Sequence, residues 1–145
     1  MTAHVKARRL VQLLREGRDY FTFAREETHD VEVSRVFARA ELARRELLDA
    51  LVQSQLIQQA SSSVPSAALS SNIGYAHLQS QFDPFHPQTH AEALYERELI
   101  LLQLIREVFH SDESEPLRLA LKAHYSTFSN CADSLHTLVR LHEAA

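Results

Sequence analysis

The sequence predicts an all-α protein, a bundle of four long helices in one domain. Only two of its 145 residues are glycine and four are proline, and three of the prolines lie between residues 65 and 87, so helix breakers are rare elsewhere. Apolar residues recur at the three- and four-residue spacing of amphipathic helices over four stretches, at about 5–28, 30–59, 88–109 and 116–143. A chain of this length can bury a sizeable core without disulfides.

The first two stretches predict an antiparallel pair of helices. Residues 28–30, Thr-His-Asp, interrupt the apolar pattern between them. Asp30 is a suitable N-cap for the second helix, whose apolar stripe begins at Val33. Because the break is so short, we expect the helix at 30–59 to turn back along the helix at 5–28.

Residues 60–87 form a crossover of different composition, rich in serine, alanine and proline. Fully extended, this segment would reach about 90 Å, whereas a 30-residue helix is about 45 Å long. The crossover can therefore return to the opposite end of the bundle. We expect part of this extra length to form a short helix from about Ile73 to Phe82, which packs Ile73, Ala76 and Leu78 or Phe82 across the bundle.

The last two stretches predict a second antiparallel pair. Thr89 and Glu92 have the spacing of a capping box at the start of the helix at 88–109. A turn at 110–116 ends in Pro116, which is tolerated in the first turn of the final helix. Two hairpins joined by one long crossover have the connection of a ferritin-like four-helix bundle, in which the second and third long helices run parallel.

Two of the apolar stripes contain a charged residue. Arg44 lies about 14 residues into the second helix and Glu98 about 10 into the third, so in parallel helices they would lie within about 6 Å in height. Gly17 lies at a similar level on the first helix and would leave room beside Arg44. We therefore expect a buried Arg44–Glu98 ion pair at the bundle centre. The alternative is that both residues lie at stripe edges and reach water.

A motif of five residues surrounds Arg44 in the first hairpin. A glycine is followed by an aromatic pair, and a phenylalanine precedes the arginine by seven residues: Gly17, Tyr20, Phe21, Phe37 and Arg44. This pattern resembles the first hairpin of a family of small bacterial ferritin-like proteins of unknown function, which are similar in topology to rubrerythrin and ferritin. Weaker similarity extends over the third and fourth helices. The resemblance implies a ferritin-like four-helix bundle.

The chain departs from the metal-binding members of that superfamily. They carry glutamate on the first and third helices and E-x-x-H on the second and fourth. Aligned on the motif, the first-helix ligand position falls on Leu13, and the second-helix pair falls on Arg44 and Leu47. Two leucines and a cation cannot hold iron. The resemblance therefore implies a bundle without the di-metal centre, in which Arg44 stands in place of the metal charge and neutralises Glu98.

Other residues of the fourth helix could supply ligands if a metal binds. His124 lies on the apolar stripe, where it is either a ligand or a hydrogen-bonded core residue. Asp133 and His136 form D-x-x-H on what we expect to be a solvated face. With Glu98, these are the candidate ligands for iron or manganese in the alternative interpretation. Cys131 is predicted to be a small buried filler.

Composition excludes several classes of partner. A formal net charge of −4 provides no field that attracts nucleic acid. The longest wholly apolar run, residues 99–102, is far shorter than the roughly 20 residues that span a bilayer, and the start of the chain has no secretory apolar segment. A lone cysteine suits a reducing compartment. We expect a cytoplasmic protein that binds neither nucleic acid nor membrane.

Three interpretations of function remain. No nucleophile motif or phosphate-binding glycine loop occurs, so a protein without catalytic activity is favoured, although the sequence does not decide this. The first interpretation is a metal-free bundle without cofactors that acts by protein interaction or self-association, and the resemblance suggests accumulation under stress. The second is a metalloprotein with a degenerate mono- or dinuclear site. The third is an adaptor that binds a partner through an exposed apolar patch on the crossover, formed by Ile73, Tyr75, Leu78 and Phe82.

Overall fold

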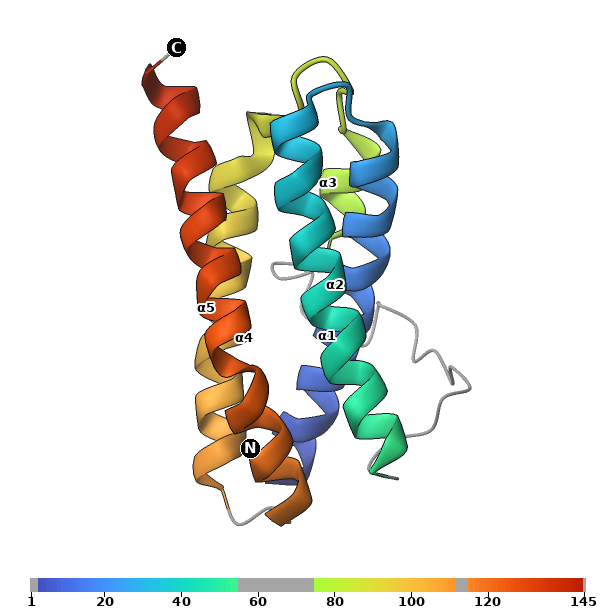
Figure 1. Cartoon of the computed structure of the whole chain (residues 1–145), viewed down its shortest axis with the longest axis vertical. Helices are drawn as coiled ribbons and strands as arrows, with labels where there is room; N and C mark the ends of the chain where they lie inside the picture. The colour runs from blue at the N-terminus through green and yellow to red at the C-terminus, as the bar shows by residue number, and fades with distance from the viewer. Residues whose placement is uncertain (1–2, 55–74, 112–114, 145) are drawn as a thin grey trace.

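The computed structural model describes residues 3–54, 75–111 and 115–144, and these ranges are helical without any strand. The all-α prediction is therefore confirmed. Four long helices lie side by side, and a short helix packs on α1 (Figure 1). The helical elements are α1 (Ala3–Glu27), α2 (Val31–Gln53), α3 (Ala76–Ser80), the 3₁₀ turn η3 (Pro87–His90), α4 (Ala91–His110) and α5 (Glu115–Ala144).

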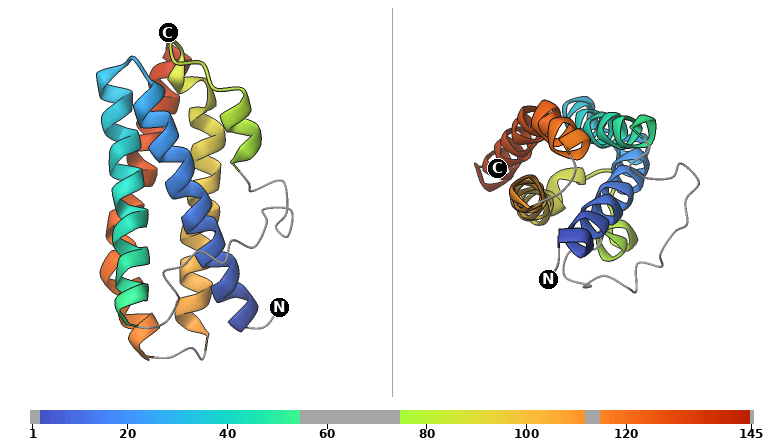
Figure 2. Two further views of the ribbon diagram at one scale, coloured as in Figure 1. Left: turned by 90° about the vertical axis from the view of Figure 1, so that its right-hand side faces the viewer. Right: turned by 90° about the horizontal axis from the view of Figure 1, so that it is seen from below.

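The four long helices form the corners of a square. Helices α1 and α5 run in one direction, and α2 and α4 run in the other (Figure 1). Seen end-on, α1 lies beside α2 and α4, and α5 lies beside the same two helices (Figure 2, right). Helices α2 and α4 are thus parallel, as the loop lengths predict, and face each other across the diagonal of the bundle.

The helix boundaries agree with the predicted ones to within a few residues where the structure describes them. Helix α2 is described to Gln53, so residues 55–59 of the predicted second helix lie outside the described residues. The short crossover helix is present as α3, Ala76–Ser80, and the predicted packing residue Ile73 also lies outside the described residues. Ala76, which was expected to pack inward, is exposed.

The start of α2 is fixed by the predicted cap. Asp30 has an extended backbone, and its Oδ1 atom accepts a hydrogen bond of 3.1 Å from the Val33 backbone N–H. This bond satisfies one of the N–H groups that the first helical turn leaves without a partner. The sharp turn between α1 and α2 therefore has a local cause in the sequence.

The predicted capping box at the start of α4 is wrong. Pro87 begins the 3₁₀ turn η3 before the α-helix, and His90, not Thr89, occupies the N-cap position, with no side-chain cap. The Thr89 hydroxyl instead donates a hydrogen bond of 2.8 Å to the His86 carbonyl. The 3₁₀ turn uses the hydroxyl that a capping box would need.

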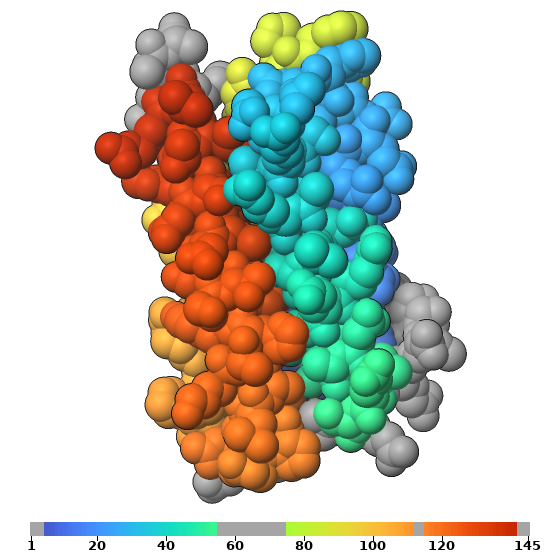
Figure 3. All heavy atoms as spheres, in the orientation of Figure 1, coloured from blue at the N-terminus to red at the C-terminus, as the bar shows by residue number. Residues whose placement is uncertain are grey.

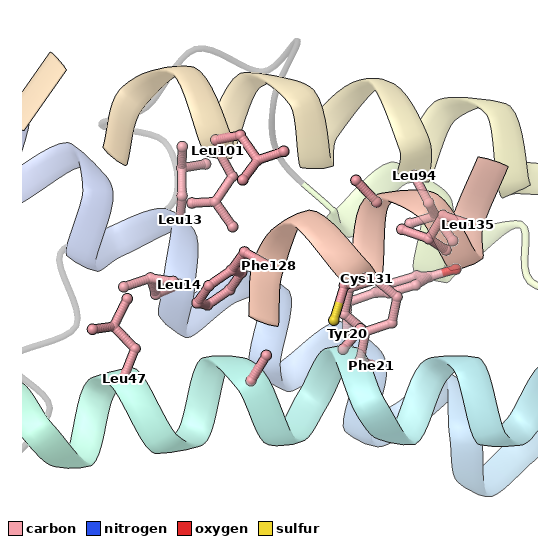
Figure 4. Close-up of a cluster of buried hydrophobic side chains, with 14 of the residues drawn as sticks. Leu13, Leu14, Tyr20, Phe21, Leu47, Leu94, Leu101, Phe128, Cys131 and Leu135 are labelled. Atoms are coloured by element: carbon pink, nitrogen blue, oxygen red, sulfur yellow. The ribbon is translucent and has the colours of Figure 1, made fainter. Parts of the chain in front are cut away.

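The core lies between the four long helices and receives side chains from each of them. Figure 3 shows α5 and α2 closing one side of the molecule in direct contact. Figure 4 shows side chains from α1, α2, α4 and α5 pointing into the common interior, among them Leu14, Leu47, Leu101 and Phe128. None of the described helices combines the length and apolar character needed to cross a membrane.

Candidate functional site

A buried ion pair connects α2 to α4 at the centre of the bundle. Arg44 Nη2 donates a hydrogen bond of 2.7 Å to Glu98 Oε2, and both side chains are 0% exposed. The predicted buried pair is therefore present, and the alternative in which both residues reach water is wrong. Because α2 and α4 are diagonal neighbours, the pair spans the bundle interior.

Arg44 is held on several sides. Its Nη1 atom donates a hydrogen bond of 3.0 Å to the Ala40 carbonyl one turn earlier in α2. The guanidinium carbon lies 4.8 Å from the ring centre of Phe21 on α1 and 5.6 Å from that of Phe128 on α5. Both distances are within the range of cation–π attraction, which is strongest for a desolvated cation. All four long helices therefore contribute to the site.

Gly17 and Tyr75 complete the surroundings of Arg44. A Cβ atom at Gly17 would lie 2.5 Å from Arg44 Nε, 3.1 Å from Arg44 Cδ and 3.2 Å from the Tyr75 hydroxyl. The missing side chain is thus the space that the arginine stem occupies, in agreement with the sequence argument. Tyr75, just before α3, accepts a hydrogen bond from the Arg44 guanidinium.

The charges at the centre stabilise each other. Burial alone would lower the pKa of Arg44, but the Glu98 carboxylate and the Tyr75 hydroxyl outweigh this effect, and the pKa lies above its ordinary value. Burial raises the pKa of Tyr75, and the Arg44 charge opposes that rise only in part. At neutral pH the site therefore holds a guanidinium cation and a protonated phenol, neither of which can act as a base.

The pair is incompletely hydrogen-bonded. Within the described residues, Arg44 Nε and Glu98 Oε1 are buried without a hydrogen-bond partner, and so is the hydroxyl of nearby Tyr20. A buried polar atom without a partner costs about 1–3 kcal/mol. The net contribution of the intact pair to stability is therefore small, although either partner alone would be costly.

The four candidate metal ligands do not converge. Glu98 faces Arg44, whereas His124 is half-buried, and Asp133 and His136 are exposed on α5. The His136 ring packs at a tilt against the Tyr95 ring, with ring centres 4.8 Å apart. No group of three His, Cys, Asp or Glu side chains among the described residues is placed to hold a metal ion.

The residues at the centre do not fit a di-metal site of the ferritin type. Leu13 and Leu47, at two of the aligned ligand positions, are buried apolar side chains. The third position holds the Arg44 cation, which would repel a metal ion. This cation is already paired with Glu98, the carboxylate at the centre of the site. The donor set is therefore too small and of the wrong charge.

The residues proposed as an exposed crossover patch are largely internal. Tyr75 and Leu78 are 5% and 4% exposed, because α3 packs them against the bundle. Phe82 is half-buried, with its ring centre 5.4 Å from that of Phe23 on α1. The fourth residue, Ile73, lies outside the described residues. The described part of this patch therefore packs mainly against the chain's own core, and only Phe82 keeps part of its apolar surface exposed.

Cys131 lies one turn after Phe128 and is buried, as predicted (Figure 4). Its Sγ atom is 3.7 Å from the Arg39 carbonyl. Burial, followed by the nearby Glu98 charge, raises the pKa of the thiol to about 11. The thiol is therefore protonated at neutral pH and a poor nucleophile.

A second buried charge was missed by the sequence analysis. The Glu41 carboxylate on α2 is 4% exposed and accepts hydrogen bonds from the Thr22 hydroxyl and, at 3.0 Å, from Arg25 Nε. It also lies 3.2 Å from Arg45 Nη2. Its position four residues after Phe37 could have placed it on the edge of the apolar stripe. The cluster connects α1 to α2.

Glu41 is expected to contribute stability that depends on pH. Burial would raise its pKa, but the hydrogen bonds from Thr22 and Arg25 and the charges of Arg25 and Arg45 lower it below the ordinary 4.5. The stabilisation is therefore complete well above pH 4.5 and is lost as the pH falls through the lower folded-state pKa. We expect Glu41→Gln to cost about 1–2 kcal/mol at pH 7 and less at pH 3.5. Urea unfolding of both proteins at the two pH values measures this, and an equal cost at both would contradict it.

Comparison of the chain with protein-family models, with curated proteins and with solved structures finds no match.

Proposed function

We propose that this chain is a non-catalytic, metal-free bundle with the ferritin-like connection, in which an ion pair stands in place of the metal centre. It acts through its outer surface, by contact with another protein or with a second copy of itself, in the cytoplasm. Accumulation under stress belongs to the same proposal and is carried only by the resemblance of the first hairpin. The observation that carries the rest is the Arg44–Glu98 pair, with both partners at 0% exposure.

The chemistry of the centre supports a structural role. A ferritin-like catalyst needs inward carboxylates and imidazoles that are free to coordinate a metal. Here the inward carboxylate is bonded to a permanent cation, and aromatic rings of Phe21 and Phe128 cover that cation. No water-accessible reactive group remains at this place. The arrangement of the helices supports the topological part of the proposal, because α2 and α4 are parallel and diagonal.

Metal content tests the proposal. The protein would be expressed in medium supplemented with iron and manganese, purified without a chelator or an affinity tag, and subjected to elemental analysis. We expect bound metal near zero, because Arg44 repels a cation from the Glu98 carboxylate at the bundle centre.

A specific site would give a different result. Binding of one or two equivalents that is lost in Glu98→Gln and kept in Glu92→Gln, an exposed carboxylate on the same helix, would overturn the proposal. Metal that stays in both variants would be attributed to the surface.

A further inference from the structure

The outer face of α4 is not covered by another helix of the described chain. Helix α4 lies at a corner of the bundle between α1 and α5 (Figure 2, right). In the middle of its outer face, Leu99 and Ile100 are 43% and 39% exposed. They border a groove of about 300 Å³ between α4 and α1, which Arg9 and Glu107 flank. The two side chains form a small apolar patch that a second surface could cover.

Two carboxylates, Glu92 and Glu96, lie towards the start of this face, and the Arg106 cation lies towards its end, next to the half-buried Glu107 that flanks the groove. At three- and four-residue spacing, exposed side chains follow one another along α4: Glu92, Glu96, Leu99, Ile100, Gln103, Arg106 and His110. Neither Glu92 nor Glu96 forms an ion pair with another described residue. Arg106 bonds to the neutral side chains of Tyr125 and Gln103 and has no carboxylate partner in the described part of the chain. The charges of this face are therefore available to a partner.

The charge pattern of α4 is complementary to that of a second copy of α4 that runs in the opposite direction. If two copies of α4 pack antiparallel about a two-fold axis beside residue 101, each residue lies level with the one equally far on the other side of that axis. Glu96 and Arg106 are each five residues, or about 7.5 Å, from it. Glu92 and His110 are each nine residues from it. The Glu96 carboxylate of one copy thus meets the Arg106 guanidinium of the other, and the Leu99 and Ile100 side chains of both copies lie within two residues of the axis.

We propose that the outer face of α4 is the site where two copies of this chain associate, antiparallel and isologous, through Leu99 and Ile100 at the centre and Glu96–Arg106 contacts on both sides. This inference rests on the proposed function, because it names the surface for self-association. The apolar centre is small beside the roughly 800 Å² per partner of a standard interface. The dimer is therefore weak and reversible, and salt weakens it further.

Sedimentation velocity of the full-length protein tests this surface, over about 5–500 μM. We expect a concentration-dependent dimer, and we expect Leu99→Glu to raise its dissociation constant at least tenfold. The matched control is Leu42→Glu, since Leu42 is an exposed leucine (51%) on the diagonally opposite helix α2. This control should dimerise like the parent. Circular dichroism and thermal melting confirm that each variant is folded.

Charge reversal tests the register. Glu96→Arg alone and Arg106→Glu alone should each weaken the dimer, because like charges then face each other at both contacts. The double variant should restore it, because the contacts form again with their signs exchanged. If the charges acted only through the helix dipole, the double variant would instead be less stably folded than either single variant, and association would not be restored.

The possible failures are distinguishable. A dimer that withstands Leu99→Glu, or that the double charge reversal does not restore, would overturn this surface while leaving self-association in place. A parent protein that is monomeric up to 500 μM would overturn the inference. In that case the proposed function would depend on a different protein as partner and on the metal analysis.

Discussion

Arg44→Leu is expected to lower the free energy of unfolding by about 3–5 kcal/mol. The substitution leaves the Glu98 carboxylate buried at 0% exposure without its cation, and removal of one partner of a buried pair typically has this cost. It also removes the hydrogen bond to the Ala40 carbonyl and the contacts with the Phe21 and Phe128 rings. Urea unfolding followed by circular dichroism measures the change.

An exposed arginine on the same helix serves as the control. Arg35 is 63% exposed and pairs with Glu32 at 3.1 Å, so Arg35→Leu should change stability by about 0.5 kcal/mol or less. If the two substitutions cost the same, burial of the charge would not be the source of the effect, and the account of the centre would be wrong.

Gly17→Ala is expected to destabilise the protein by about 1–3 kcal/mol, although alanine is the better helix former by about 1 kcal/mol. The added Cβ would lie 2.5 Å from Arg44 Nε, and the arginine cannot move away because Glu98, Phe21 and Phe128 surround it. Thermal and urea unfolding of the variant measure the net effect.

The same substitution in a second protein, without the ion pair, separates the steric cost of the added Cβ from the gain in helix propensity. In a protein that already carries Arg44→Leu and Glu98→Leu, the atom nearest to the new Cβ is gone. Gly17→Ala should then be neutral or stabilising. A gain in stability in the parent protein as well would show that Gly17 does not make room for Arg44.

The ion pair at the bundle centre could be predicted from the sequence, because its two residues interrupt periodic apolar patterns. Arg44 and Glu98 interrupt apolar stripes, and the rise per residue places them at one level once the crossover makes their helices parallel. Gly17 follows from the same arithmetic. The cap at Asp30 is also local, since a side chain and a backbone N–H three residues away decide it.

Other parts of the site and fold depend on tertiary contacts that the spacing of apolar residues does not reveal. The adaptor interpretation placed Tyr75 on an exposed patch, but Tyr75 belongs to the ion-pair site, because α3 packs against α1. The buried Glu41 carboxylate is satisfied by donors from Thr22 and Arg25 on the neighbouring helix. The capping-box motif at Thr89 was misleading, because the Thr89 hydroxyl donates its hydrogen bond within the preceding 3₁₀ turn.

Arg44 and Glu98 at the middle of this bundle act as one coupled charge pair, and not as two independent polar residues. A double-mutant cycle of urea unfolding on the parent, Arg44→Leu, Glu98→Leu and the double variant tests this coupling most directly. We predict that each single change costs about 3–5 kcal/mol and that the double variant is close to the parent, because unsatisfied Arg44 Nε and Glu98 Oε1 disappear with the charges. Additivity of the two single costs within about 0.5 kcal/mol would contradict the claim.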